Sequence, residues 1–413
     1  MERIVLKKIN KSSCALGTKI SYDYTMPNKF NKYIRKQDDH IETLWVEYPC
    51  DLKDVPDAVL IVPFVGIMLT VTSMLNIGIV INELDKTFFK SLKDVEKVFQ
   101  SIYKTKKIKF NVNCNRLIEC NYNCKNKYSI FFTGGVDATS ALIEKINYDP
   151  LLINIWGGDI RLTDNSSHQE LDHYFNKVSK ALDLKYVFVK TNAREMFNEN
   201  KLGEKCLEIL GRKYNHDWWS SIAHILSMTS TIAPFVYKKR IKKHYIGSSY
   251  EYTSNTFDSN NPLLIDSIKY CSCSFEIVDN ILDRNDKVKK IIQFSRAWKK
   301  NNYNRLPLEL KVCWNRSEGK NCSNCEKCYR TIMNIILNRG NPNDFGFFVN
   351  EQVLNQIREF LLSNKVNSAF WLQIKKEFLK NKDYWKNQKD ISWILDIKIN
   401  SYRVYLYRLL KKL

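Results

Sequence analysis

Short apolar runs alternate with amphipathic stretches from residue 128 onward. The apolar runs are rich in β-branched and aromatic residues, as buried strands are, whereas the amphipathic stretches repeat their apolar residues at helical spacing. The predicted strands are 129–132, 151–156, 186–190 and 244–246, and the predicted helices are 139–145, 168–182, 218–237 and 288–298. This alternation predicts an α/β fold, in which a parallel sheet has helices on both faces and a ligand site beyond the carboxyl ends of its strands.

The flanking regions show other patterns. Residues 1–125 mix short β-like runs such as 43–48 with a helical segment at 92–103, which predicts a separate α+β region. Residues 341–413 are predicted to be helical and basic, with tryptophans and tyrosines among the lysines. With the α/β region at 126–340 the chain therefore has three predicted parts, and the outer two offer surfaces for a protein partner.

Residues 58–82 contain no charged side chain and exceed the roughly 20 residues that a membrane-spanning helix needs. Pro63, Gly66 and Gly78 interrupt the stretch, and Asn76 separates its two apolar runs. We therefore expect two buried elements of a protein core and no membrane span.

The segment 128–142 runs from a strand pattern through two adjacent glycines into the start of a helix. Gly134 and Gly135 allow the backbone to turn sharply and to approach a ligand, and the amides that follow lie at a helix N-terminus, where the dipole favours an anion. Thr133 and Thr139 add hydroxyl groups. Because a Gly-Gly turn is common on its own, the prediction of a phosphate site depends on the whole string.

A second motif lies far downstream, where Cys313, Cys322, Cys325 and Cys328 follow one another within a short segment. Thiolates at this spacing can bind one ion from a single turn, and Cys313 supplies the fourth ligand of a tetrahedron typical of structural zinc. An iron–sulfur cluster is the alternative. Four thiolates leave no open coordination position, so we expect a zinc ion that fastens the end of the domain and takes no part in chemistry.

The glycine-containing string resembles the PP-loop, Ser-Gly-Gly-x-Asp-Ser, of the ATP pyrophosphatases. These enzymes split ATP between the α and β phosphates and transfer AMP to a substrate oxygen. Four positions match, with threonine for the first serine, and Ala138 replaces the last serine. The resemblance implies a Mg²⁺-ATP site formed by Thr133, Gly134, Gly135, Val136, Asp137 and Thr139.

Both motifs together resemble the 7-cyano-7-deazaguanine synthase family, the QueC-like proteins, over residues 128–340. The resemblance implies a Rossmann-type (HUP-like) PP-loop domain with ATP, Mg²⁺ and Zn²⁺ as cofactors. It implies a ligase or synthase that adenylates a carboxylate-bearing small molecule, after which a nitrogen nucleophile forms an amide or nitrile. The acceptor would be a 7-deazaguanine, with conjugation to a partner protein as an alternative. Asp137 and Lys287 are the implied catalytic residues, since this family carries a basic residue near the ATP phosphates at the place of Lys287.

Other candidate site residues lie at the ends of the predicted strands. Asp159 follows the second strand, where it faces a ribose or substrate or caps a turn. Gly247 and Ser248 end the fourth strand, where small residues let a ligand come close. Arg194 and Arg284 are candidate clamps for a substrate carboxylate or phosphate, with an ordinary surface charge as the alternative for each.

The formal net charge of +21 and the isoelectric point near 9.3 would attract a polyanion. Lysine is spread along the whole chain and no nucleic-acid module accompanies it, so nucleic acid is an alternative partner and not the favoured one. Twelve cysteines without a signal-peptide pattern indicate a reducing cytoplasm. Two other functions stay open, namely a nucleotide- or RNA-binding scaffold with a degenerate loop, and a PP-loop tRNA-modifying or amidotransferase enzyme.

Overall fold

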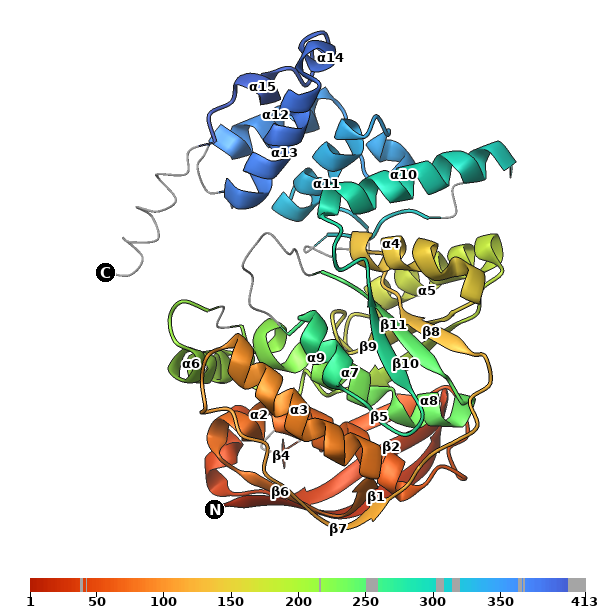
Figure 1. The fold of residues 1–413 in the computed structure, drawn as a ribbon, viewed down its shortest axis with the longest axis vertical. Coiled ribbons are helices and arrows are strands. Elements are labelled where there is room, and N and C mark those ends of the chain that lie inside the picture. The colour runs from red at the N-terminus through yellow and green to blue at the C-terminus, as the bar shows by residue number, and fades with distance from the viewer. Residues whose placement is uncertain are drawn as a thin grey trace.

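The computed structural model describes residues 1–413 except for 38–39, 42, 215–216, 250–258, 302–307, 314–319, 363–365, 367 and 400–413. One ten-stranded sheet forms its centre (Figure 1). The N-terminal strands lie at one end of the molecule and the C-terminal helices at the other, with α10 (Arg284–Asn301) and α11 (Glu326–Leu337) next to those helices.

The strand order of the sheet is β12-β11-β8-β9-β10-β5-β2-β1-β6-β7. The strands are β1 (Arg3–Cys14), β2 (Gly17–Thr25), β5 (Trp45–Tyr48), β6 (Gly78–Asp85), β7 (Val112–Ile118), β8 (Tyr128–Phe131), β9 (Leu151–Trp156), β10 (Tyr186–Thr191), β11 (Lys243–Gly247) and β12 (Ser274–Val278). The first five strands in this order pair in parallel, as do β1, β6 and β7, whereas β5 and β2 connect the two groups through antiparallel pairs. A separate ribbon pairs β3 (Lys36–Gln37) with β4 (His40–Ile41). The predicted α/β class is confirmed, and the sheet is mixed but largely parallel.

β5 joins the N-terminal strands to the parallel group. Thr191 of β10 pairs with Val46 of β5, and the Asn192 side chain accepts a hydrogen bond of 3.0 Å from the Trp45 amide. A single hydrophobic core also extends from Ile4 to residues of β12. The region predicted at 1–125 thus shares both the sheet and the core of the α/β region.

Residues 130–132 show how the sheet is covered on both faces. Ile130 and Phe132 pack with α4 (Val136–Lys145) and α5 (Asn165–Leu182), whereas Phe131 belongs to the core on the opposite face. This alternation is the period of two expected of a strand. The opposite core takes in α2 (Val62–Leu75), α3 (Lys86–Ile102), α6 (Glu199–Leu210), α7 (His224–Thr231), α8 (Ala233–Lys239) and α9 (Pro262–Ser267).

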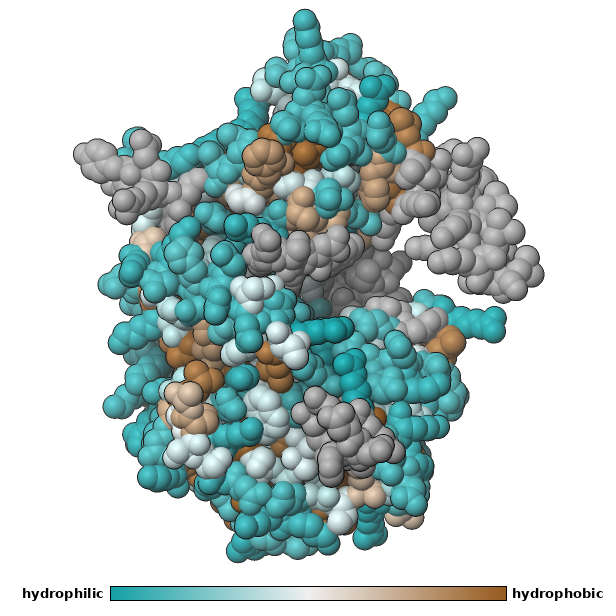
Figure 2. All heavy atoms as spheres, turned by 180° about the vertical axis from the view of Figure 1, so that it is seen from behind, coloured by the Kyte–Doolittle hydropathy of each residue, from teal (hydrophilic) through white to brown (hydrophobic). Residues whose placement is uncertain are grey.

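The uncharged stretch forms a buried helix and a strand. α1 (Asp57–Leu60) leads into α2, Asn76 ends α2 in the left-handed conformation, and β6 begins at Gly78. The span Asp57–Leu75 is long and apolar enough to cross a membrane, yet 94% of its most apolar window is buried inside the protein. Hydrophilic residues predominate on the face drawn in Figure 2, and hydrophobic residues occur there in small groups.

The C-terminal helices form a third core with α10 and α11. They are α12 (Glu351–Leu362), α13 (Ser368–Lys380), α14 (Lys382–Lys386) and α15 (Trp393–Asp396). The predicted helical character of this region is therefore seen up to α15. Residues 400–413 lie outside the described part of the chain.

Three helices differ from the sequence prediction in ways that affect the site. α4 begins at Val136 and not at residue 139, so Asp137 and Ala138 lie in its first turn. α10 begins at Arg284 and not at residue 288, so Arg284 and Lys287 lie in its first turn instead of ahead of it. The predicted helix 218–237 consists of a π-helical turn, η3 (Trp219–Ala223), followed by α7 and α8.

Candidate functional site

Residues 133–138, here called the glycine loop, comprise the turn that follows β8 and the first residues of α4. Gly134 has a φ of +75°, which L side chains rarely adopt, and an added Cβ would lie 2.7 Å from the ring of Tyr174. Gly135 is the N-cap of α4 and has an extended conformation that any residue can take. The amides that follow lie at the N-terminus of α4, where an anion is favoured. The predicted strand–turn–helix is present, and only Gly134 is required by its backbone conformation.

The glycine loop lies where the strand order reverses. β8 has β9 on one side and β11 on the other, and the chain passes through β9 and β10 before it returns to β11. At the end of β11, a Cβ added to Gly247 would lie 2.5 Å from the Asp137 carbonyl oxygen and 3.0 Å from the Ala138 amide nitrogen. In parallel sheets a crevice at such a reversal is the usual ligand site.

Asp137, in the first turn of α4, has two cationic partners. Lys287 Nζ donates a hydrogen bond of 2.9 Å to one carboxylate oxygen, and an Arg284 nitrogen lies 3.5 Å from the other. Lys287 also donates to the backbone carbonyl of Ser248 and so links the loop to the end of β11. Burial by itself raises the pKa of Asp137, but the charges of Arg284 and Lys287 outweigh it and hold the pKa below its usual value. The structure therefore brings together four predicted site residues from three distant segments.

Solvent reaches the predicted loop residues unequally. The half-buried ones are Thr133, Gly135, Asp137 and Ala138, and the buried ones are Gly134, Val136 and Thr139, as are Ser248 and Lys287 near the loop. Thr139 has no exposed surface, and its Oγ1 has no hydrogen-bond partner in the described parts of the chain. The hydroxyl that Ala138 lacks is thus not replaced by Thr139 in this conformation.

A recess opens beside the glycine loop at the carboxyl ends of β8 and β9. Its empty volume is about 800 Å³, which includes space open to solvent. Polar lining residues are Thr133, Asn154, Asp159, Ser167, His224, Lys311, Lys320 and Asn321. Apolar lining residues include Phe131, Ile153, Ile155, Trp219 and Met228. The recess therefore combines an apolar wall with several polar groups, as small-molecule sites do.

Asp159 and Arg194 are neighbours near the ends of β9 and β10. The Arg194 guanidinium donates two hydrogen bonds to the Glu199 carboxylate, at 2.7 and 3.2 Å, and one of 3.2 Å to the Gly158 carbonyl. It also lies 3.7 Å from an Asp159 oxygen and 4.7 Å from the centre of the Trp219 ring. Asp159 and Trp219 line the recess, whereas Arg194 does not. Arg194 therefore contacts two lining residues from behind the surface of the recess. A direct substrate contact by Arg194 stays a prediction.

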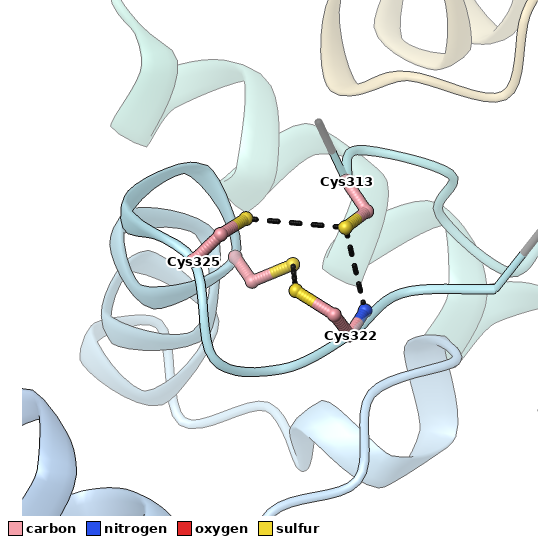
Figure 3. A group of neighbouring side chains, drawn as sticks. Cys313, Cys322 and Cys325 are labelled. Carbon is pink, nitrogen blue, oxygen red and sulfur yellow. Dashed lines mark hydrogen bonds between the residues drawn. The ribbon is translucent and has the colours of Figure 1, made fainter. Parts of the chain in front are cut away.

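The four cysteines converge on one point (Figure 3). Their sulfur atoms all lie within 4.8 Å of one another, and the Cys313–Cys325 and Cys322–Cys328 sulfur pairs are each 3.9 Å apart. Cys325 is the N-cap of α11 and Cys328 lies in its first turn, while the other two precede the helix. In the part of the chain that the structure describes, no other group of cysteine, histidine or acidic side chains has metal-ligand geometry.

This donor set suits one tetrahedral ion. Four sulfurs at about 2.3 Å from a zinc ion lie about 3.8 Å from one another, close to the separations of the two pairs above. In an iron–sulfur cluster the thiolates are divided among two or four irons, so sulfurs on different irons would lie farther apart than the 4.8 Å within which all four lie here. Hydrogen bonding to Cys325 and then burial raise the pKa of Cys328, and a bound cation would favour the ionised form of this thiol. The cluster is compatible with the predicted zinc site.

The cysteine segment also borders the recess. The sequence did not predict this proximity. Cys313 lines the recess together with Lys311, so the cluster does not stand apart from the candidate site. The recess is also lined by Trp219, which begins the η3 turn, and by His224, which follows it, and His224 Nδ1 lies 2.9 Å from Asn260 Oδ1. π turns inside helices often occur at functional sites, but the apolar pattern of the sequence gives no sign of this one.

No protein-family model matches the chain, and no curated protein or solved structure matches it. Fold and site therefore define the class of protein directly. It is an α/β protein with a ten-stranded, mixed and largely parallel sheet and a four-cysteine cluster suited to a metal ion.

Proposed function

We propose that this protein is an ATP-dependent enzyme of the PP-loop type that adenylates a carboxylate. The geometry around the glycine loop carries the proposal. The glycine loop lies at the reversal of strand order, its Asp137 is held by Lys287 and Arg284, and an open recess adjoins it. Helix N-terminal amides and fixed cations are the groups that hold a polyphosphate chain.

The proposed reaction has two steps. A carboxylate oxygen of the acceptor attacks the α-phosphorus of ATP, the bond to the bridging oxygen breaks, and pyrophosphate leaves with the electron pair. A nitrogen nucleophile then attacks the acyl carbon, AMP leaves, and a proton is released as the amide forms. Both steps depend on positioning and on stabilisation of phosphate charge, so they need few reactive side chains.

The charged residues of the site have distinct roles in this proposal. Thr133 and the amides of the glycine loop hold the phosphates, and Asp137 orients Lys287 and Arg284 around them. Mg²⁺, when bound with ATP, would supply positive charge to the phosphate oxygens, and Asp137 is the carboxylate of the loop that would hold it. Because Gly247 has no side chain, the backbone of the glycine loop can lie against the end of β11.

The recess supports a flat, heteroaromatic acid as acceptor. Trp219 and the aliphatic side chains provide a surface for a planar ring, and Lys311 and Lys320 bring positive charge for a carboxylate or phosphate. A 7-carboxy-7-deazaguanine-like base is the specific acceptor proposed. Transfer of its acyl group to an amine of a partner protein is the alternative second step.

Release of AMP and pyrophosphate from ATP tests the proposal. We expect Asp137→Asn and Asp137→Ala to lower the rate at least tenfold, about 1.4 kcal/mol of lost transition-state stabilisation. The matched control is Asp94→Asn, which removes an exposed carboxylate of α3 paired with Lys97. An Asp137→Asn protein that folds and turns over at the wild-type rate would exclude the loop from the mechanism. Mass spectrometry of the protein incubated with ATP and candidate acids identifies the adenylated acceptor.

A second function, a nucleotide- or RNA-binding scaffold, is favoured by Ala138. This residue is half-buried against the core of α4 and α5, and a serine there would add the hydroxyl that the motif has at this position. The scaffold predicts ATP binding without AMP release and polyanion binding that weakens steeply with salt. Ala138→Ser separates the two functions, since an enzyme gains or keeps turnover while an inert scaffold releases no AMP with either residue.

A further inference from the structure

The cysteine-bearing segment reaches the glycine loop at one specific contact. The backbone amide of Lys311 donates a hydrogen bond of 2.8 Å to the carbonyl of Gly134. Two residues later the chain supplies the metal ligand Cys313, and both residues line the recess next to Thr133. Lys311 is therefore fixed beside the loop at its backbone.

Tyr174 of α5 contacts both the glycine loop and the segment 309–311. Its hydroxyl donates a hydrogen bond of 2.7 Å to the Glu309 carbonyl, and its ring packs against Gly134 at the place where a Cβ would otherwise lie. The Lys311 ammonium lies 5.3 Å from the centre of the same ring. One aromatic side chain thus fixes the turn of the glycine loop, the segment 309–311 and the amine of Lys311 relative to one another.

The side chain of Asn321 also holds the segment that carries Lys311. The Asn321 amide group donates hydrogen bonds of 2.7 Å to the Leu310 carbonyl and 3.0 Å to the Gly346 carbonyl, and its oxygen accepts one of 2.9 Å from the Val312 amide. These bonds fix the backbone of residues 310–312 beside the recess that Lys311 lines. A lysine on a segment held in this way loses little further backbone freedom when it binds a ligand.

Charge indicates what this lysine binds. Lys287 and Arg284 lie on the Asp137 side of the loop, where they already balance a carboxylate. Lys311 lies on the recess side with Thr133, next to loop amides that favour anions. We infer that Lys311 is a phosphate-binding residue that holds the phosphate chain of the nucleotide from the side opposite Lys287. This assignment rests on the proposed function.

Calorimetric binding of ATP, inorganic pyrophosphate and adenosine to the full chain tests the assignment. We expect Lys311→Met, which keeps the aliphatic stem on Tyr174, to weaken ATP and pyrophosphate binding roughly tenfold and to leave adenosine binding unchanged. Lys311→Arg keeps the charge and should restore most of the affinity. Lys177→Met is the matched control, because it removes an exposed lysine that pairs with Glu309 outside the recess.

Two negative outcomes can be told apart. Wild-type protein that binds neither ATP nor pyrophosphate refutes the proposed function, and the assignment of Lys311 with it. Wild-type protein that binds both, with unchanged affinities for a folded Lys311→Met variant, refutes the assignment of Lys311 alone. Circular dichroism and melting curves establish that each variant is folded.

Discussion

Gly247 ends β11 against the backbone of Asp137 and Ala138, with no room for a Cβ between them. The contact is between two main chains, so a neighbouring side chain cannot rotate away to make space. Gly134 meets a different constraint, since its positive φ and the Tyr174 ring both exclude a side chain there. The position of the glycine loop therefore depends on atoms that these residues lack.

We expect Gly247→Ala to displace the glycine loop and to weaken ATP binding at least tenfold, because the new methyl group would lie 2.5 Å from the Asp137 carbonyl oxygen. Gly78→Ala in β6 is the matched control, since its Cβ would lie 3.2 Å from the flexible end of Met1. Calorimetric titration with ATP measures both variants. An unchanged affinity in Gly247→Ala would show that the loop moves without cost or that the nucleotide binds elsewhere.

Among the elements, the start of α11 and the chain before it contribute both to the four-cysteine cluster and to the recess. The helix places two cysteines, Cys325 as its N-cap and Cys328 in its first turn, and the chain before it carries the other two. The same chain supplies Lys311 and Asn321 to the recess. Metal binding at this point would thus hold α11, the segment 308–313 and the edge of the recess together.

We expect one zinc ion per chain and a melting temperature several degrees lower for Cys325→Ser, because the binding energy of a structural zinc site is folding energy. Cys14→Ser, at the end of β1 and away from the cluster, is the control and should retain zinc and stability. Elemental analysis of anaerobically prepared protein and melting curves measure this. Iron with acid-labile sulfide in place of zinc, or an unchanged melting temperature, contradicts the prediction.

For the whole molecule, the continuity of the sheet matters most. β5 covers the edge of β10 that would otherwise end the parallel group, and α2 is buried against α7 on the far side of the same core. The N-terminal strands therefore complete the scaffold that holds the site, whatever further partner they bind. An uncovered β10 edge and an exposed core face would favour aggregation.

We expect a chain that begins at residue 126 to be insoluble or to lack cooperative unfolding, since it loses β5 and the buried α2. Supplying residues 1–125 as a second chain should restore solubility if the interface re-forms. Gel filtration and thermal unfolding followed by circular dichroism measure both cases. A soluble fragment 126–413 with a cooperative transition would show that the α/β region folds by itself.

Much of the local structure could be predicted from sequence. The strand at 151–156 was placed at its observed bounds, and the strand–glycine–helix unit and the convergence of the four cysteines were also predicted. Each depends on a short-range signal, such as periodicity, turn residues or ligand spacing. The start of α10 was misplaced and the π turn within the predicted helix 218–237 was not predicted, because packing against distant segments overrides local propensity.

The sequence by itself determined that a glycine loop follows a buried strand and that four cysteines can share an ion, because neighbours in the chain fix these features. Only the tertiary structure decided which distant residues meet. It brought Lys287 to Asp137, Gly247 to the loop backbone, and Lys311 to the recess. It also buried Thr139 and joined the N-terminal strands to β10. These outcomes depend on strand order and side-chain packing across the whole sheet, which no local pattern records.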